Sequence, residues 1–300
     1  MKEYRLISDK EREHLFSMLL AKKLDLSEAP HHVVGVVYGQ HEKQKMNIYL
    51  PETGNGPFPV IFFIHGGGWQ GGSRGDTQVK PFLHGIKRGY AVISCSYRLL
   101  PDGRFPENLF DIKAALRFIK AHADEYLLDD ERIVIAGASA GAQLALMAGF
   151  TVGVPAFEGG DIRKAPKIRA IIDQFGPTDF LHEDAFYEQS GYARANPPAE
   201  DGGITARLLG ADTLSHPELL SFISPINNVH PDIPPVLILH GKYDPMVAYQ
   251  HSENLYRKIC DVCGDDRAKL IISDECTHAD TKYESEPYTS AIFDFIEKYI

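Results

Sequence analysis

A serine between two glycines stands near the middle of the chain, where it could act as a nucleophile. A β-branched run at residues 133–136 leads into Gly-Ala-Ser-Ala-Gly at 137–141, and an alanine-rich stretch follows. This pattern is typical of a nucleophile elbow, a strained strand-to-helix turn that raises the serine oxygen above a sheet. Side chains at the two glycine positions would collide with the neighbouring strand or helix. The alternative is that Ser139 only caps the following helix.

An acid and a base that could activate this serine come later in the chain. Asp244 follows the apolar run 236–239, and His278 follows the run 270–272. Residues just beyond the carboxyl ends of parallel strands converge on one crevice, so Ser139, Asp244 and His278 are expected to meet there. A hydroxyl needs a base to become nucleophilic, and the base needs an acid that fixes its tautomer.

Other residues compete for the roles of acid and base. Asp244 precedes Pro245 and could instead form a turn, while Asp179 is a rival acid. The histidines that compete with His278 are His230, His240 and His251. His278 is favoured because, of these four, it alone lies beyond the last expected strand.

A glycine run could complete the site. Residues 65–69 read His-Gly-Gly-Gly-Trp and follow an apolar run. The backbone N–H groups of Gly67, Gly68 and Ala140 are expected to bind the oxygen that becomes negative in a tetrahedral intermediate. Loss of one such donor typically raises the barrier by about 2.7–4 kcal/mol.

Several side chains near this run are expected to support the site. The ring of His65 should brace the glycine loop. Trp69 is a candidate substrate-binding residue, and packing beneath the loop is the alternative. Asp111 and Asp173 are expected to be structural partners of nearby loops, with Arg98 as one such partner.

The elements that must position these residues alternate between strands and helices. Strands are expected at residues 32–38, 45–50, 60–64, 91–96, 133–136, 170–174, 236–240 and 269–272. The first two should pair antiparallel. A helix is expected at 108–122, where Ile112, Leu116 and Ile119 recur on one face, and an amphipathic helix closes the chain. This order predicts an α/β fold with a mostly parallel central sheet of about eight strands, flanked by helices.

One segment, residues 177–229, interrupts this alternation with aromatic, acidic, glycine- and proline-containing sequence. Long insertions inside compact domains are usually functional, so we expect an inserted lid or cap within a single domain spanning residues 1–300. Its aromatic residues could line an acyl pocket, but packing within the lid is favoured for any one of them. These aromatic residues are Phe180, Phe186, Tyr187 and Tyr192.

The composition is that of an ordinary globular chain, with 300 residues of which 44% are hydrophobic and 24% charged. A net charge of -10 disfavours nucleic acid and anionic membranes as partners, because both need a basic face. No apolar run approaches the ~20 residues of a membrane span. Residues 1–6 lack the apolar stretch of a signal peptide, so a cytoplasmic location is expected, or secretion if a signal peptide was trimmed.

The four cysteines are too few and too unevenly spaced for a disulfide framework. They are Cys95, Cys260, Cys263 and Cys276. Cys95 is expected to be a buried strand residue. Cys260 and Cys263 form a Cys-x-x-Cys pair, but no second pair completes four ligands, so ordinary helix-end cysteines are favoured over a metal site. No metal or other cofactor is expected.

Five motifs, at residues 65–69, 96–99, 105–108, 137–141 and 173–179, together resemble those of α/β-hydrolase esterases. The resemblance is strongest to the hormone-sensitive-lipase-like branch and, within it, to bacterial carbohydrate esterases that remove acetyl or feruloyl groups from xylan. It covers roughly residues 33–298 and implies the eight-stranded α/β-hydrolase fold, a cofactor-free Ser-His-Asp mechanism, and short-chain or aromatic ester substrates.

Two details modify the resemblance. The tryptophan that ends the first motif is also similar to that of kynurenine formamidases. Thr277 precedes His278 where relatives usually have glycine, which makes this loop stiffer.

The sequence thus predicts a serine carboxylic ester hydrolase that forms an acyl-enzyme and releases acetyl or feruloyl groups from plant cell-wall polysaccharide such as xylan. An amide hydrolase of the arylformamidase or peptidase type would use the same residues. A non-catalytic binding protein is disfavoured because Ser139, Asp244 and His278 are all present. The expected partner is a small-molecule or carbohydrate ester, and the oligomeric state is left open.

Overall fold

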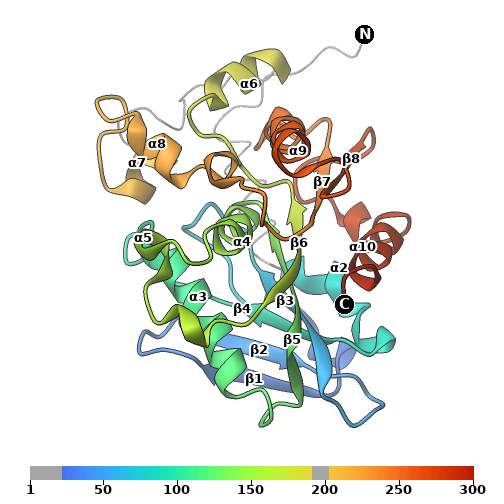
Figure 1. Ribbon diagram of the computed structural model, residues 1–300. Coiled ribbons are helices and arrows are strands. Elements are labelled where there is room, and N and C mark those ends of the chain that lie inside the picture. Colours follow the sequence, from blue (N-terminus) through green and yellow to red (C-terminus); the bar gives the residue numbers. More distant parts are fainter. Residues whose placement is uncertain (1–21, 191–202) are drawn as a thin grey trace.

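The fold is built around a central β-sheet. The computed structural model describes residues 22–190 and 203–300, in which eight strands lie in the order β1-β2-β4-β3-β5-β6-β7-β8 (Figure 1). The strands are β1 His32–Val37, β2 Lys45–Tyr49, β3 Phe58–Ile64, β4 Ala91–Cys95, β5 Leu128–Ala138, β6 Ile168–Gln174, β7 Val236–Gly241 and β8 Ala268–Ser273. β2 pairs antiparallel with β1 and β4, and the other pairs are parallel. The mostly parallel sheet and its opening antiparallel pair are confirmed.

Helices cover both faces of this sheet. The α-helices are α2 Lys80–Leu83, α3 Glu107–Ala121, α4 Ala140–Phe150, α5 Pro155–Glu158, α6 Glu183–Ser190, α7 Ile204–Leu209, α8 Glu218–Ile223, α9 Gln250–Cys263 and α10 Tyr288–Glu297. Side chains of α3, α4 and α9 share one apolar cluster with the sheet, and those of α2 and α10 share the other (Figure 1). Among short 3-10 helices, η2 Thr77–Val79 and η6 Thr281–Glu284 lie near the site described below.

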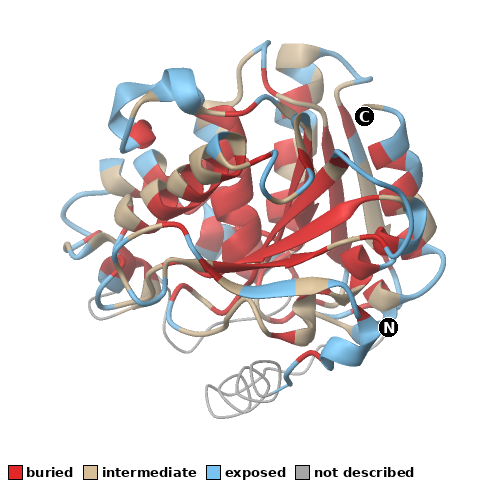
Figure 2. Cartoon of the chain, turned by 90° about the horizontal axis from the view of Figure 1, so that it is seen from below, coloured by how far each residue is buried: buried red, intermediate tan, exposed pale blue. Residues whose placement is uncertain are grey.

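The central strands are apolar on both faces because helices bury both. In β3, Val60 and Phe62 pack into the α3/α4/α9 cluster, whereas Ile61 and Phe63 pack into the α2/α10 cluster. All four side chains are at most 1% exposed. Figure 2 shows these strands as a buried band between the helices. A strand covered on both faces reads as a continuous apolar run, which is why residues 60–64 were recognisable as a buried strand.

A buried ion pair ties α3 to the loop after β4. The Arg98 guanidinium donates to both oxygens of Asp111, with Nη2 2.7 Å from Oδ1, and Asp111 is 1% exposed. A buried carboxylate needs such a partner to offset its lost hydration. The expected partnership between Arg98 and Asp111 is therefore confirmed.

The segment between β6 and β7 holds α6, α7 and α8, which lie beyond the carboxyl ends of the central strands (Figure 1). Phe180, Phe186 and Tyr187 are at most 5% exposed, as expected for packing residues. Tyr192 lies outside the described residues. That residues 177–229 act as a lid stays a prediction.

Two further features concern cysteines and membranes. Cys95 is buried in β4, and Cys260 and Cys263 lie in the last turn of α9, which confirms the expected strand and helix-end positions. Throughout the described part of the chain, no helix has the length and apolar character needed to cross a membrane. Residues 1–6, considered above for a signal peptide, lie outside it.

Candidate active site

Ser139 occupies the turn between β5 and α4 with φ 53° and ψ −121°. A positive φ is strained for a residue with a side chain, so this is the tight corner that the motif predicts. Ser139 stands at the N-cap position of α4, yet its side chain makes no capping hydrogen bond. The capping alternative is therefore wrong, and the hydroxyl is left for another partner.

Two glycines let this corner form. A Cβ atom at Gly137 would lie 2.2 Å from the carbonyl oxygen of Gly141, and one at Gly141 would lie 2.2 Å from the carbonyl oxygen of Ile64. Both contacts are far inside van der Waals distance and involve backbone, which has little freedom to move. The predicted collisions with neighbouring strand and helix are confirmed.

Replacing Gly141 with alanine should destabilise the protein by about 3 kcal/mol, the upper end of the usual cost of overpacking. The cost is high because the new methyl group would press on β3, which carries the glycine loop. A lowered urea midpoint would measure it. Gly75→Ala is the matched control, because a Cβ there would meet only the Ser73 hydroxyl at 3.8 Å and φ is not positive. Equal midpoints for the two variants would contradict this expectation.

The structure brings Ser139, His278 and Asp244 together although they are far apart in the chain. His278 Nε2 lies 3.0 Å from Ser139 Oγ, and His278 Nδ1 lies 2.6 Å from Asp244 Oδ2. Asp244 follows β7 and His278 follows β8, so the carboxyl edge of the sheet sets this geometry. The three groups form a hydrogen-bonded chain from a buried carboxylate to a hydroxyl.

Asp244 is also a turn former, as its position before Pro245 suggested. Its Oδ1 accepts the backbone N–H groups of Met246 and Val247, while Oδ2 faces His278. Burial opposes ionisation, but the His278 charge and hydrogen bonds from His240 and His278 dominate and hold the pKa of Asp244 well below its usual value. Asp244 is therefore an ionised carboxylate at neutral pH.

The competing residues lie elsewhere or have other partners. Asp179 Oδ2 pairs with His182 at 2.8 Å. His230 Nε2 contacts the carbonyl oxygen of Phe150, and His251 Nδ1 accepts the backbone N–H of Thr178. The remaining competitor, His240, lies beside Asp244. No spacing of residues in the sequence predicts this contact.

The glycine loop begins close to the serine, since a Cβ atom at Gly66 would lie 3.1 Å from Ser139 Cβ. Gly67 and Gly68 have φ values of 125° and 55°, and a Cβ at Gly67 would lie 2.3 Å from the carbonyl oxygen of Gly71. Neither of their amides donates to a backbone carbonyl within residues 22–190 and 203–300. Ala140 begins α4, so its N–H has no intrahelical acceptor.

Polar side chains that sequence reasoning missed hold this loop. Gln78 Oε1 accepts the Gly66 N–H at 2.9 Å. The indole N–H of Trp69 donates to Gln143 Oε1, and Gln143 Nε2 donates to the carbonyl oxygen of Ile223 in α8. Gln143 thereby links the glycine loop, the helix after the serine and the inserted segment.

Trp69 and His65 are both packed inside the protein. Trp69 is 5% exposed and its ring lies 5.9 Å from that of Phe180, which matches the packing alternative. A role for Trp69 in substrate binding stays a prediction. The His65 ring stacks on Tyr97 at 4.7 Å, and its Nδ1 lies 2.8 Å from the carbonyl oxygen of Gly66, so it braces the loop as expected.

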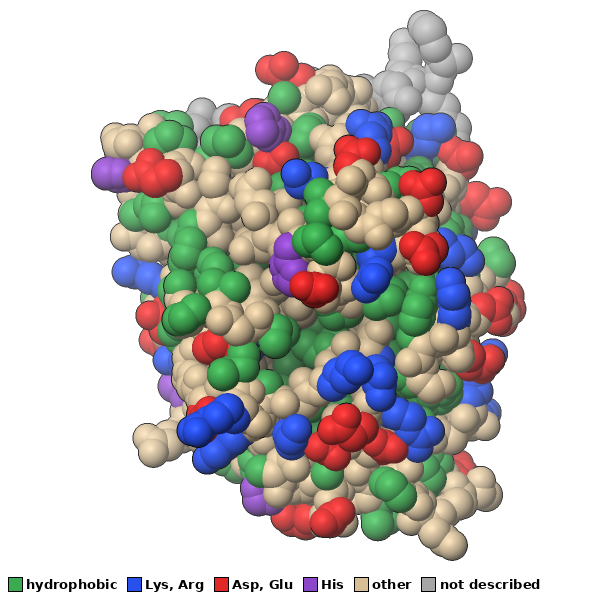
Figure 3. Space-filling model, viewed as in Figure 1, with side chains coloured by type: hydrophobic (Ala, Val, Ile, Leu, Met, Phe, Trp, Pro, Cys, Tyr) green, Lys and Arg blue, Asp and Glu red, His purple; other side chains and the backbone are tan. Residues whose placement is uncertain are grey.

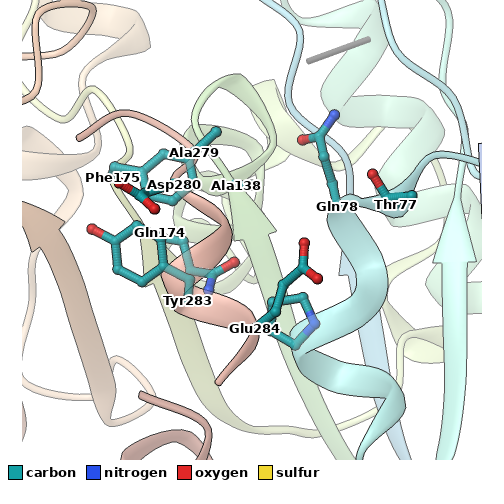
Figure 4. Close-up of a pocket in the computed structure, with 10 residues that line it drawn as sticks. Thr77, Gln78, Ala138, Gln174, Phe175, Ala279, Asp280, Tyr283 and Glu284 are labelled. Atoms are coloured by element: carbon teal, nitrogen blue, oxygen red, sulfur yellow. The ribbon is translucent and has the colours of Figure 1, made fainter. Parts of the chain in front are cut away.

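A small cavity of about 40 Å³ lies between η2 and η6, next to Ala138 (Figure 4). Its lining mixes polar groups with apolar ones. It includes the amides of Gln78 and Gln174, the carboxylates of Asp280 and Glu284, and the apolar side chains of Pro81, Phe175 and Ala279. Gln174 Nε2 is buried and has no hydrogen-bond partner within the described residues. The cavity has room for ordered water or a polar group of a few atoms.

Two observations concern the surface charge and the groups that could bind a metal. On the face seen in Figure 3, basic and acidic side chains are interspersed, and the described residues form no broad basic surface there. Among the described residues, no group of three or more His, Cys, Asp or Glu side chains is arranged as metal ligands would be.

One known protein family and several known proteins are similar to this chain. The BD-FAE family matches residues 46–259. The chain is similar to the esterase LipC of Mycobacterium tuberculosis, with 28% identity over 75% of this chain and 54% of LipC. It therefore spans about half the length of that relative.

Solved structures are similar over nearly the whole chain. A truncated carbohydrate esterase from gut microbiota has a TM-score of 0.79 and 28% identity, covering 92% of this chain and 99% of that one. Esterase B from Lactobacillus rhamnosis has a TM-score of 0.73 and 19% identity, covering 96% and 90%, and supports the fold alone. The α/β-hydrolase fold implied by the sequence motifs is confirmed.

Proposed function

The chain belongs to the BD-FAE family, and we propose that it is a serine carboxylic ester hydrolase. The single observation that carries the proposal is the hydrogen-bonded chain from Asp244 through His278 to Ser139. This arrangement can remove a proton from a hydroxyl at neutral pH and return it to a leaving group.

In the first half-reaction, Ser139 Oγ attacks the ester carbonyl carbon and its proton passes to His278 Nε2. Asp244 stabilises the imidazolium that forms and keeps the ring oriented through Nδ1. The tetrahedral intermediate then breaks its bond to the alcohol oxygen, which takes the proton from Nε2. The acyl group stays on Ser139.

In the second half-reaction, water attacks the acyl carbon while His278 Nε2 takes its proton. The intermediate collapses, the proton returns to Ser139 Oγ, and the carboxylic acid leaves. In both steps the amides of Gly67, Gly68 and Ala140 donate to the oxyanion. Their preorganised N–H groups need no rearrangement as charge develops.

The segment 177–229 is proposed to cap the site, within a single domain. Its described parts, residues 177–190 and 203–229, lie beyond the strand ends that carry Ser139 and His278 (Figure 1). The hydrogen bond from Gln143 to Ile223 anchors α8 to the helix that follows the serine. A cap would limit water access and contribute to substrate choice.

The proposed substrates are acetyl or feruloyl esters of plant cell-wall polysaccharide such as xylan. The similarity to a carbohydrate esterase over nearly its full length supports this choice.

A substrate panel tests the proposal. We expect acetate or ferulate release from acetylated xylan or methyl ferulate with a higher kcat/KM than deformylation of N-formylkynurenine. p-Nitrophenyl acetate should serve as a general reporter of ester hydrolysis. Faster turnover of N-formylkynurenine would favour an amide hydrolase instead, and wild-type protein inactive on every ester would refute the proposal.

A further inference from the structure

A second histidine contacts the proposed catalytic acid from inside the protein. His240 lies in β7, and its side chain, like that of Asp244, is fully buried. His240 Nε2 lies 3.2 Å from Asp244 Oδ2 and 2.9 Å from the carbonyl oxygen of Val247. His240 Nδ1 lies 2.6 Å from Ser252 Oγ, which α9 supplies. The mechanism described above makes no use of this ring.

The neighbours of Nε2 determine where its proton lies. A carbonyl oxygen and an ionised carboxylate only accept hydrogen bonds, so Nε2 must carry the proton and donate. Asp244 Oδ2 therefore accepts from two imidazoles, those of His278 and His240. Its other oxygen already accepts the N–H groups of Met246 and Val247. Four donors thus surround one buried carboxylate.

We propose that His240 is a positioning residue that holds the Asp244 carboxylate in place and moderates the basicity of His278. The proposal rests on the proposed function of this site. Each donor to a carboxylate spreads its negative charge, so the donor on His240 weakens the attraction between Asp244 and a protonated His278. Without the donor on His240, Asp244 would attract the protonated form of His278 more strongly.

Other ionisable groups face this cluster from the packed elements. Asp173 in β6 acts on His240 electrostatically, and burial raises the pKa of Asp173 to about 7. Tyr283 in η6 faces Asp244, and burial raises its pKa far above the usual value, so it stays protonated. The ionisation of Asp173 therefore overlaps with a pH profile of activity near neutrality, so the test includes a variant that lacks this carboxylate.

A pair of substitutions isolates the Nε2 hydrogen bond. In His240→Gln the amide nitrogen can take the place of Nε2 and still donate to Asp244. In His240→Asn the shorter amide reaches the position of Nδ1, so it keeps contact with Ser252 and loses the donor to Asp244. Both side chains are polar and uncharged, which matches the two variants in charge. Asparagine is one methylene smaller, so the position of the acidic limb, and not the rate alone, reports the hydrogen bond.

The readout is the pH profile of kcat/KM for p-nitrophenyl acetate in the wild type and both variants. We expect His240→Asn to lose about tenfold in kcat/KM at neutral pH, typical of losing a hydrogen bond to a charged group. Its acidic limb should move to higher pH. His240→Gln should recover most of the rate and keep the wild-type limb. The shift should persist when Asp173→Asn is added to all three proteins.

The possible results of this experiment distinguish a failure of the inference from a failure of the proposed function. Titration with a phosphonate that phosphonylates the serine counts the folded active sites, so each rate is normalised to them. Equal rates and equal limbs in the Asn and Gln variants overturn the inference. So does an equal loss in both without a moved limb, because that result indicates packing alone. Inactive wild-type protein would instead refute the proposed function itself.

Discussion

Ser139→Ala should lower kcat for p-nitrophenyl acetate by about a million-fold, to a residual rate that depends on binding and the oxyanion donors. The effect is large because the methyl group cannot form an acyl-enzyme and gives His278 no proton to accept. Steady-state rates compared with burst kinetics of the wild type would measure it. The wild-type burst of p-nitrophenol should disappear in the variant.

The matched control for this change is Ser27→Ala, which removes an exposed hydroxyl in a short 3-10 helix. It should keep wild-type kinetics. Activity that survives in Ser139→Ala at more than about a hundredth of the wild-type rate would mean that another residue is the nucleophile, because triad serines contribute far more than this factor.

Asp244→Asn should reduce kcat by about 10⁴-fold at neutral pH, since an amide cannot stabilise the imidazolium and favours the wrong tautomer of His278. The structure makes this position sensitive, because Oδ2 accepts from His278 at 2.6 Å while Oδ1 holds the turn at Met246. The asparagine oxygen can still accept from that turn. The fold should therefore survive, and circular dichroism with kcat measurements would separate the two effects.

Asp179→Asn is the matched control, because it makes the same change from carboxylate to amide. Asp179 is the rival acid by sequence, but its carboxylate pairs with the exposed His182. This variant should stay within a few-fold of the wild type. A loss in Asp179→Asn comparable to that in Asp244→Asn would reverse the assignment of the acid.

Sequence patterns were most informative where the cause of structure is local. The elbow could be predicted because Gly137 and Gly141 are needed wherever a strand turns sharply into a helix. The strands could be predicted because burial on both faces demands an unbroken apolar run, as in β3. Boundaries moved by a few residues, and β5 begins at Leu128 rather than at residue 133.

Sequence patterns did not predict the role of a side chain where that role depends on a partner far along the chain. Gln78 and Gln143 hold the glycine loop through contacts with Gly66 and Trp69, and neither sits in a motif that suggests it. Trp69 could be read as a substrate contact or as a packing residue. Only the position of Gln143 and Phe180 around its indole favoured packing.

By itself, the sequence determined the order of the strands along the chain, the helix at 108–122, the closing helix, the serine turn, and the polar residues that follow strand ends, because each depends on neighbours within one element. Helices such as α2 and α5 were not among the expected elements. Tertiary structure decided which acid meets His278, and that His240 lies behind that acid. Those choices depend on strand order in the sheet and on the direction of side chains from β7 and β8, which no local pattern of residues encodes.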